Sequence, residues 1–383
     1  MTAAPIYLDH QATTPVDPRV VEAMSSYWNE EFGNAHSSNH AFGWRADEAV
    51  QKARQSIADL IGADAKEIVF TSGATEANNL AILGLLGHTM AGRTRVVVSA
   101  IEHKCVLQSS RQLSRLGYEV ILAPVNPSGH VDVDALGKLI NENTALVSIM
   151  AVNNEIGTIQ PLEKISSLCH SAGAVFHSDA AQAATAIHID VDHLSVDMMS
   201  LSSHKLYGPK GIGALFVSHA MRDQLRPLIH GGGQEGGLRS GTLPVPLCVG
   251  FGTAASILHE ELGTDAARLE SIRDLFLQTL RYRFVDFEIT GGGSGHPGNL
   301  NLRFPGIDTE ILTSNVQPKL AISTGAACAS GTPEPSHVLR AIGLTAQQAG
   351  ECVRIGFGRF TDEKQAHDGA HLLAEAVVAL RGN

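Results

Sequence analysis

The sequence lacks features that would assign it to several common functional classes. Positive charge is scarce: 28 Lys and Arg residues against 39 Asp and Glu give a net charge of −11 over 383 residues. Because a nucleic-acid backbone is bound by a basic surface, direct nucleic-acid binding is not expected. Long apolar runs are also missing. The longest, near residues 80–87, is too short to cross a bilayer, so no membrane association is expected.

Cysteine is scarce as well. There are five cysteines, widely spaced and without a C-x-x-C pair. A disulfide framework or a zinc site is therefore not expected, and no other pattern indicates a metal. The N-terminus has no basic segment followed by an apolar stretch. This absence predicts that there is no signal peptide and that the protein is cytoplasmic.

Short apolar runs alternate with helical patterns through the first two-thirds of the chain. Such alternation predicts an α/β domain built on a mainly parallel, seven-stranded sheet. The runs are continuously apolar, which is typical of strands buried on both faces. The expected strands are Glu67–Thr71, Arg95–Ser99, Glu119–Ala123, Ala145–Met150, Ala174–Ser178, Met198–Ser202 and Ala214–Val217, and the expected helices between them include Thr75–Leu86, Lys104–Leu116, Val133–Ile140 and Pro161–Ser171.

The last third has a different pattern. The seventh strand follows the sixth after a turn too short for a crossover helix, so we expect it to be antiparallel. A glycine-rich stretch at 231–241 ends the alternation, and a long amphipathic helix is expected after it, from about Pro246 to Leu262 and again from Ala266 to Arg281. We predict a large domain at 16–262. The remainder, 1–15 with 263–383, is predicted to form a smaller α+β domain.

Polar or ionisable groups follow five of the seven expected strands. In an open α/β sheet, ligands bind beyond the carboxyl ends of the strands. The turn at 71–76 (TSGATE) opens a helix, whose free N–H groups suit a phosphate. Asp179 could pair with a protonated pyridine nitrogen, and Lys205 could form a Schiff base. Together these groups match the parts of pyridoxal 5′-phosphate (PLP); His103 could stack on its ring, Gln182 could donate to its ring oxygen, and Ser202 and His204 could help with its phosphate.

Each of these residues alone has a more ordinary interpretation. An aspartate at a strand end is more often a helix cap, a single histidine is often structural, and a single lysine is usually a surface residue. Their combination, in this order and at strand ends, is what favours a PLP site.

Two residues of the last third could take part in the chemistry. Cys328 lies among small residues at 323–333 (STGAACASGTP), which is typical of an exposed loop where a thiol can react. The other four cysteines have apolar or helical surroundings and are expected to be inert. Arg354 could bind a carboxylate as a bidentate fork. A structural ion pair is the alternative for Arg354.

The chain resembles the cysteine desulfurases of the NifS/IscS type, which are fold-type I PLP enzymes of aminotransferase class V. The resemblance covers nearly the whole length. It rests on the motifs at 7–15 (YLDHQATTP), 71–76 (TSGATE), 153–157 (NNEIG), 203–211 (SHKLYGPKG), 239–244 (RSGTLP) and 354–360 (RIGFGRF), and on the Cys328 loop with Glu334-Pro335-Ser336.

The resemblance implies a role for each matching residue. Lys205 would bind PLP covalently, and His103 would stack on the ring and act as acid and base. Cys328 would take up the sulfur of the substrate. Asp179 and Gln182 would hold the ring nitrogen and oxygen. The phosphate would be bound by Ala74, Thr75, Ser202 and His204 and by Thr242 of the other subunit of a homodimer, and the substrate carboxylate by Asn34, Asn154 and Arg354.

The activity implied is the conversion of L-cysteine to L-alanine, with the sulfur held as a persulfide on Cys328. A protein acceptor would then receive it for iron–sulfur cluster assembly, tRNA thiolation or sulfur modification of DNA. The alternatives within the fold are a selenocysteine lyase or another class V aminotransferase-like enzyme. A subunit that keeps the fold only to activate a partner is a further alternative. The last alternative is a dinucleotide-binding oxidoreductase, and the only support for it is a single weak motif at 293–298 (GSGHPG).

Overall fold

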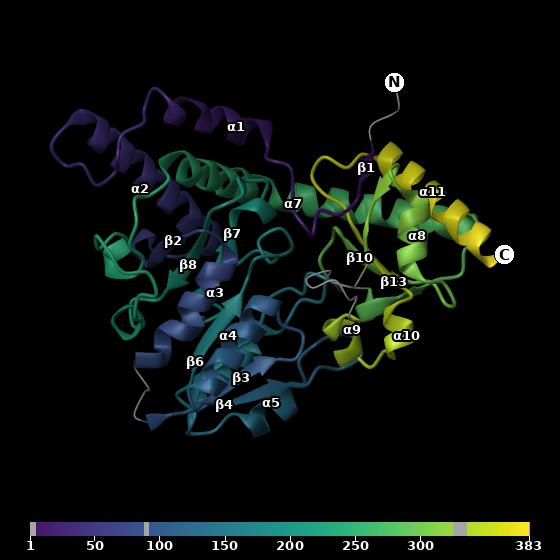
Figure 1. The fold of residues 1–383 in the computed structure, drawn as a ribbon, viewed down its shortest axis with the longest axis horizontal. Helices are drawn as coiled ribbons and strands as arrows, with labels where there is room; N and C mark the ends of the chain where they lie inside the picture. Colours follow the sequence, from purple (N-terminus) through teal and green to yellow (C-terminus); the bar gives the residue numbers. More distant parts are fainter. Residues whose placement is uncertain (1–4, 88–91, 294, 325–334, 383) are drawn as a thin grey trace.

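The computed structural model describes residues 5–87, 92–293, 295–324 and 335–382. Its centre is a seven-stranded sheet with the order β2-β8-β7-β6-β5-β3-β4 (Figure 1). Only β8 is antiparallel to its neighbours; the other pairs are parallel. The strands are β2 (Ile68–Thr71), β3 (Arg95–Ser99), β4 (Glu119–Ala123), β5 (Thr144–Ser148), β6 (Val175–Asp179), β7 (Met198–Ser202) and β8 (Gly213–Val217). The α/β fold with a mainly parallel sheet is thus confirmed.

Helices cover both faces of this sheet. Because successive side chains of a strand point to opposite faces, Val97 and Phe176 enter one core while Val96 and Val175 enter the other. The core on the Val97 face includes α2 (Ala41–Ile61), α5 (Val133–Leu139), α6 (Leu162–Ser171) and the start of α7 (Val245–Tyr282). The core on the Val96 face includes α3 (Ala74–Leu83) and α4 (Lys104–Arg115). Burial on both faces explains why the strands are continuously apolar.

The long helix α7 differs from the prediction. The helical pattern was expected to be interrupted at 263–265, but Val245–Tyr282 form one continuous helix that joins the two halves of the molecule (Figure 1). Its first part buries Phe251 in the core of the large sheet, and its last part buries Phe276 in a second core. Gly263 costs only about 1 kcal/mol of helix propensity relative to Ala, and packing at both ends of the helix exceeds that cost.

The second core lies beside a smaller sheet with the order β12-β13-β10-β9, and β1 pairs in parallel with β11. Its elements are β1 (Ile6–Tyr7), β9 (Glu288–Ile289), β10 (Asn299–Arg303), α8 (Thr309–Val316), β11 (Leu320–Ala321), β12 (Ser323–Thr324), α9 (His337–Ala341), α10 (Ala346–Ala349), β13 (Cys352–Gly356) and α11 (Glu363–Arg381). The remaining helix, α1 (Pro18–Ser25), packs on α7. None of the helices in the described ranges is both long and apolar enough to span a bilayer.

Candidate active site

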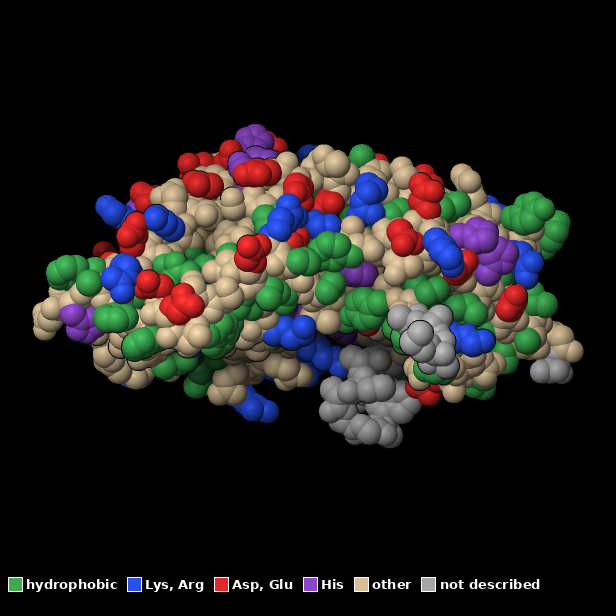
Figure 2. Space-filling model, turned by 90° about the horizontal axis from the view of Figure 1, so that it is seen from above, with side chains coloured by type: hydrophobic (Ala, Val, Ile, Leu, Met, Phe, Trp, Pro, Cys, Tyr) green, Lys and Arg blue, Asp and Glu red, His purple; other side chains and the backbone are tan. Residues whose placement is uncertain are grey.

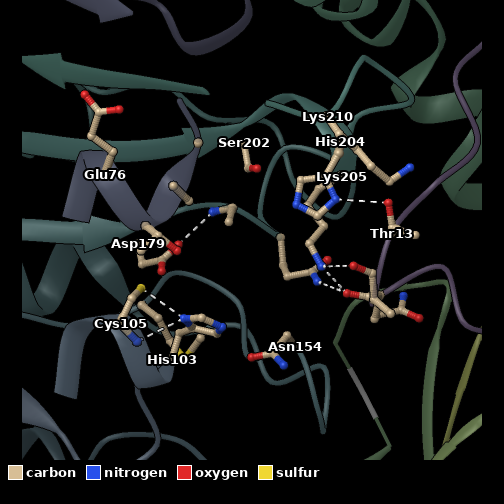
Figure 3. Close-up of a pocket in the computed structure, with 18 of the residues that line it drawn as sticks. Thr13, Glu76, His103, Cys105, Asn154, Asp179, Ser202, His204, Lys205 and Lys210 are labelled. Carbon is tan, nitrogen blue, oxygen red and sulfur yellow. Dashed lines mark hydrogen bonds between the residues drawn. The ribbon is translucent and has the colours of Figure 1, made fainter. Parts of the chain in front are cut away.

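A cavity of about 660 Å³ lies at the carboxyl ends of the large sheet. This volume is within the range of sites for small molecules. The N-terminal segment (residues 11–13, with Thr13 labelled in Figure 3) and Arg354 of β13 also line it, so the seven-stranded and the four-stranded sheet both contribute. Many of the predicted site residues line it, namely Ala74, Thr75, His103, Asn154, Asp179, Gln182, Ser202, His204, Lys205 and Arg354.

Lys205 follows β7, and its amine points into this cavity (Figure 3). The amine donates hydrogen bonds to the backbone carbonyls of Gln11 and Ala12, the latter at 2.9 Å. Burial, and after it the positive charge of Arg354, lower the pKa of Lys205 to about 8 against the opposing effects of Asp9 and Asp179. A larger fraction of the amine is therefore neutral and nucleophilic near pH 7 than for a solvent-exposed lysine.

Asp179 ends β6 and is buried. Its Oδ2 accepts a hydrogen bond from Nδ2 of Asn78 at 2.7 Å, and its Oδ1 accepts one from the backbone N–H of Ala181 at 3.0 Å. Both donors fix the orientation of the carboxylate. A fixed carboxylate is what a pyridinium nitrogen requires as a partner.

The opposite end of the cavity suits an anion. Helix α3 begins there after Gly73, whose φ of +151° strongly favours glycine. The first N–H groups of a helix have no acceptor within the helix, and they carry the positive end of its dipole. Lys210 also lines the cavity. Burial, with the nearby charges of Lys205 and Lys210, lowers the pKa of His204 to about 4, so this ring is neutral at pH 7.

His103 lies at the start of α4, where its Nδ1 accepts the backbone N–H of Cys105 at 3.2 Å. Removal of water by the surrounding walls lowers its pKa; Asp179 opposes this shift and Lys205 adds to it. The imidazole is therefore mostly neutral near pH 7 and able to accept a proton.

Arg354 makes the structural ion pair that was one of its two interpretations. Its Nη2 donates to Oδ1 of Asp9 at 2.8 Å, and its Nη1 donates to the backbone carbonyl of Asn154 at 3.1 Å. Its Nε–H is buried and has no hydrogen-bond partner in the structure. These bonds fix the guanidinium at the cavity wall.

Three predicted residues are not among the cavity residues of this chain. Asn34 and Thr242 are both exposed, and Oδ1 of Asn34 accepts the backbone N–H of His36 at 2.9 Å. Cys328 lies outside the residues that the structure describes.

The structure also adds residues that the strand-end pattern did not single out. Asn78 holds Asp179 from the middle of α3, Asp9 holds Arg354 from the N-terminal segment, and Cys105 and Lys210 line the cavity. Nothing in the sequence around Asn78 indicates this role, because an asparagine within a helix is usually a surface residue. Only the position of β6 beside α3 shows that Asn78 reaches Asp179.

The donor set fits PLP. An amine with a lowered pKa, a fixed carboxylate and a helix N-terminus surround a single cavity of suitable volume, and they match the aldehyde, the pyridine nitrogen and the phosphate of that cofactor.

Comparisons with known proteins extend over nearly the whole chain. A family model described as aminotransferase class V matches residues 6–368. The cysteine desulfurase IscS of Rickettsia rickettsii (strain Iowa) is 46% identical over 378 residues, which cover 98% of this chain and 92% of that protein. A solved structure of a NifS-like protein aligns with a TM-score of 0.90 at 35% identity, over 99% of this chain and all of the other. The structure titled "SspA in complex with cysteine" aligns with a TM-score of 0.82 at 39% identity, over 93% of this chain and 99% of that one.

Proposed function

Since the chain belongs to the class V aminotransferase family of PLP-dependent enzymes, we propose that it is a cysteine desulfurase. It would convert L-cysteine to L-alanine and receive the sulfur as a persulfide on Cys328. The observation that carries the proposal is the cavity in which Lys205, Asp179 and Arg354 meet. The high identity to proteins named cysteine desulfurase supports it, as does the similarity to a structure solved with cysteine.

The cofactor would be held by residues of the cavity. When bound, PLP supplies an electron-withdrawing ring that makes the α-proton of an amino acid acidic. Lys205 would carry the cofactor and then serve as the base for that proton. Asp179 would pair with the ring nitrogen and Gln182 with the ring oxygen, while Ala74, Thr75, Ser202 and His204 would bind the phosphate.

The substrate carboxylate would lie against Arg354. The guanidinium lines the cavity, and it can bind a carboxylate by charge-assisted hydrogen bonds. Asn154 would add a second contact from the same wall. We propose Asn34 as a third contact.

His103 would handle the protons of the two thiols. Its lowered pKa leaves a neutral imidazole, whose N–H can donate to the sulfur of the substrate. As the C–S bond of the substrate breaks, an S–S bond would form at Cys328.

We propose that the enzyme is a homodimer. Large aromatic side chains are exposed around α1 and α2, and Figure 2 shows hydrophobic side chains gathered at that end of the molecule. They are Trp28, Phe32, Phe42 and Trp44, and we call them the aromatic face. Thr242 is exposed in the single chain, and in a dimer it would reach the phosphate of the partner. The sulfur would pass in the cytoplasm to a protein acceptor, for iron–sulfur clusters, tRNA thiolation or DNA modification.

The test is to measure alanine and sulfide formed from L-cysteine by the PLP-loaded enzyme. Lys205→Ala should lose the absorbance of the lysine-linked cofactor and all activity. Cys328→Ala should keep that absorbance but lose sulfide formation, whereas Cys169→Ala, a buried cysteine outside the cavity, should keep both. A Cys328→Ala enzyme that still releases sulfide at the wild-type rate would reject the proposal. Unchanged turnover of selenocysteine in that variant would favour a selenocysteine lyase.

A further inference from the structure

The proposed reaction does not use Cys105, a thiol in the wall of the cavity. Its Sγ lies 2.9 Å from Nδ1 of His103, and its backbone N–H donates to the same nitrogen at 3.2 Å. A backbone N–H can only donate, so Nδ1 must be the acceptor and carries no proton. The neutral imidazole of His103 therefore has its proton on Nε2. Figure 3 shows this second nitrogen pointing away from Cys105.

The surroundings of the thiol fix the direction of its proton. Nδ2 of Asn78 donates to Sγ of Cys105 at 3.2 Å and to Oδ2 of Asp179 at 2.7 Å. The sulfur thus accepts from Asn78, and its own S–H is available for Nδ1 of His103. Burial first, and the charge of Asp179 second, raise the pKa of Cys105 to about 12, so the thiol stays protonated at neutral pH.

We infer that Cys105 is a positioning residue for His103, whose imidazole it holds in the tautomer that presents Nε2–H to the cavity. Asn78 joins this contact to Asp179, so one hydrogen-bonded chain runs from the partner of the ring nitrogen to the acid–base group. The inference rests on the proposed function, in which His103 handles the protons of the substrate.

The contact belongs to this cysteine in particular. Cys169, Cys248 and Cys352 are also buried, but among the described residues none of them bonds to a histidine. The charged and titratable groups that act on His103 are Asp179 on β6, Lys205 after β7, His337 on α9 and Lys104 on its own helix. A change at Cys105 leaves all four in place, so their effect on the imidazole is common to wild type and variants.

The first test follows His103 itself and does not require turnover. Hydrogen–deuterium exchange at the C2 carbon of imidazole, read by mass spectrometry of peptides, gives a titration midpoint for each histidine. It is measured on the cofactor-free and the PLP-loaded protein, for Cys105→Ala, Cys105→Ser and the control Cys352→Ala.

Loss of the S–H donor removes a hydrogen bond that favours the neutral ring. The midpoint of His103 in Cys105→Ala should therefore rise by roughly half a pH unit, as expected for one hydrogen bond. Serine can donate to Nδ1 and accept from Asn78 as the thiol does, so Cys105→Ser should return the midpoint toward wild type. Cys352→Ala should leave it unchanged.

The second test separates positioning from binding. For Cys105→Ala, kcat should fall by about five- to tenfold, the equivalent of one hydrogen bond, with little change in KM. The acid limb of the pH profile should move to higher pH, and serine should recover most of kcat. If Cys105→Ala leaves both the His103 midpoint and kcat at wild-type values, the inference is wrong. A shifted midpoint in a protein that forms no alanine from cysteine would instead overturn the proposed function and support the contact.

Discussion

At the scale of single residues, the properties of Lys205 follow from its neighbours. The sequence places this lysine at a strand end, but its pKa of about 8 arises because the fold buries the amine and brings Arg354 close to it. The same holds for Arg354, whose ion pair joins β13 to Asp9, more than 300 residues earlier. Residue types could thus be read from the sequence, whereas their charge states depend on contacts between distant segments.

This pKa predicts how cofactor-free protein takes up PLP. The amine must be neutral to react, so the rate of uptake should rise with pH, with a midpoint near 8, and level off above it. Arg354→Leu removes a positive charge that lowers this pKa, so its midpoint should lie at higher pH. The measurement is the growth of cofactor absorbance after mixing at a series of pH values. Arg95→Gln, at the opposite end of the sheet, is the control; an equal shift there would contradict the assignment.

At the scale of elements, strands were predicted better than helix ends. Each expected strand is present to within two residues, because continuous apolar runs mark strands buried on both faces. Helix α7 was predicted as a long helix with an interruption at 263–265, which the structure does not have. Its continuity is supported by packing against two cores, which no local pattern contains.

The glycines of α7 give a matched pair of substitutions. A Cβ on Gly252 would lie 2.4 Å from Cα of Ala53 on α2, whereas a Cβ on Gly263 would meet nothing within 4 Å. Gly252→Ala should therefore destabilise the protein by about 1–3 kcal/mol through overpacking. Gly263→Ala should stabilise it by up to about 1 kcal/mol through helix propensity. Urea unfolding followed by circular dichroism tests both; a Gly252→Ala protein as stable as wild type would show that α2 and α7 do not pack this closely.

At the scale of the whole molecule, the aromatic face predicts an assembly. The protein should sediment with about twice the mass of the 40.5 kDa chain. Trp44→Glu should shift it toward the monomer and weaken its affinity for PLP, because Thr242 would no longer reach the partner's site. Analytical ultracentrifugation and cofactor titration measure the two effects. Tyr282→Glu, which alters an exposed aromatic residue outside that face, is the control. A wild-type protein that binds PLP tightly as a monomer would contradict this proposal.

The predicted division into a domain at 16–262 and one formed by 1–15 with 263–383 stays a prediction. The described residues show a seven-stranded sheet with a core on each face and a four-stranded sheet with a core of its own, and α7 passes through position 262 without a break. The cavity takes residues from both sides of that division, among them Lys205 and Arg354.

The sequence by itself determined the fold class and most residues of the cavity. Continuous apolar runs identify the buried strands, and the polar residues that form the cavity directly follow those runs in the sequence. Tertiary structure alone decided the partners: Asn78 for Asp179, Asp9 for Arg354 and Cys105 for the ring of His103. Such pairings depend on how elements cross in space, and the charge states they set depend on water that the folded chain excludes.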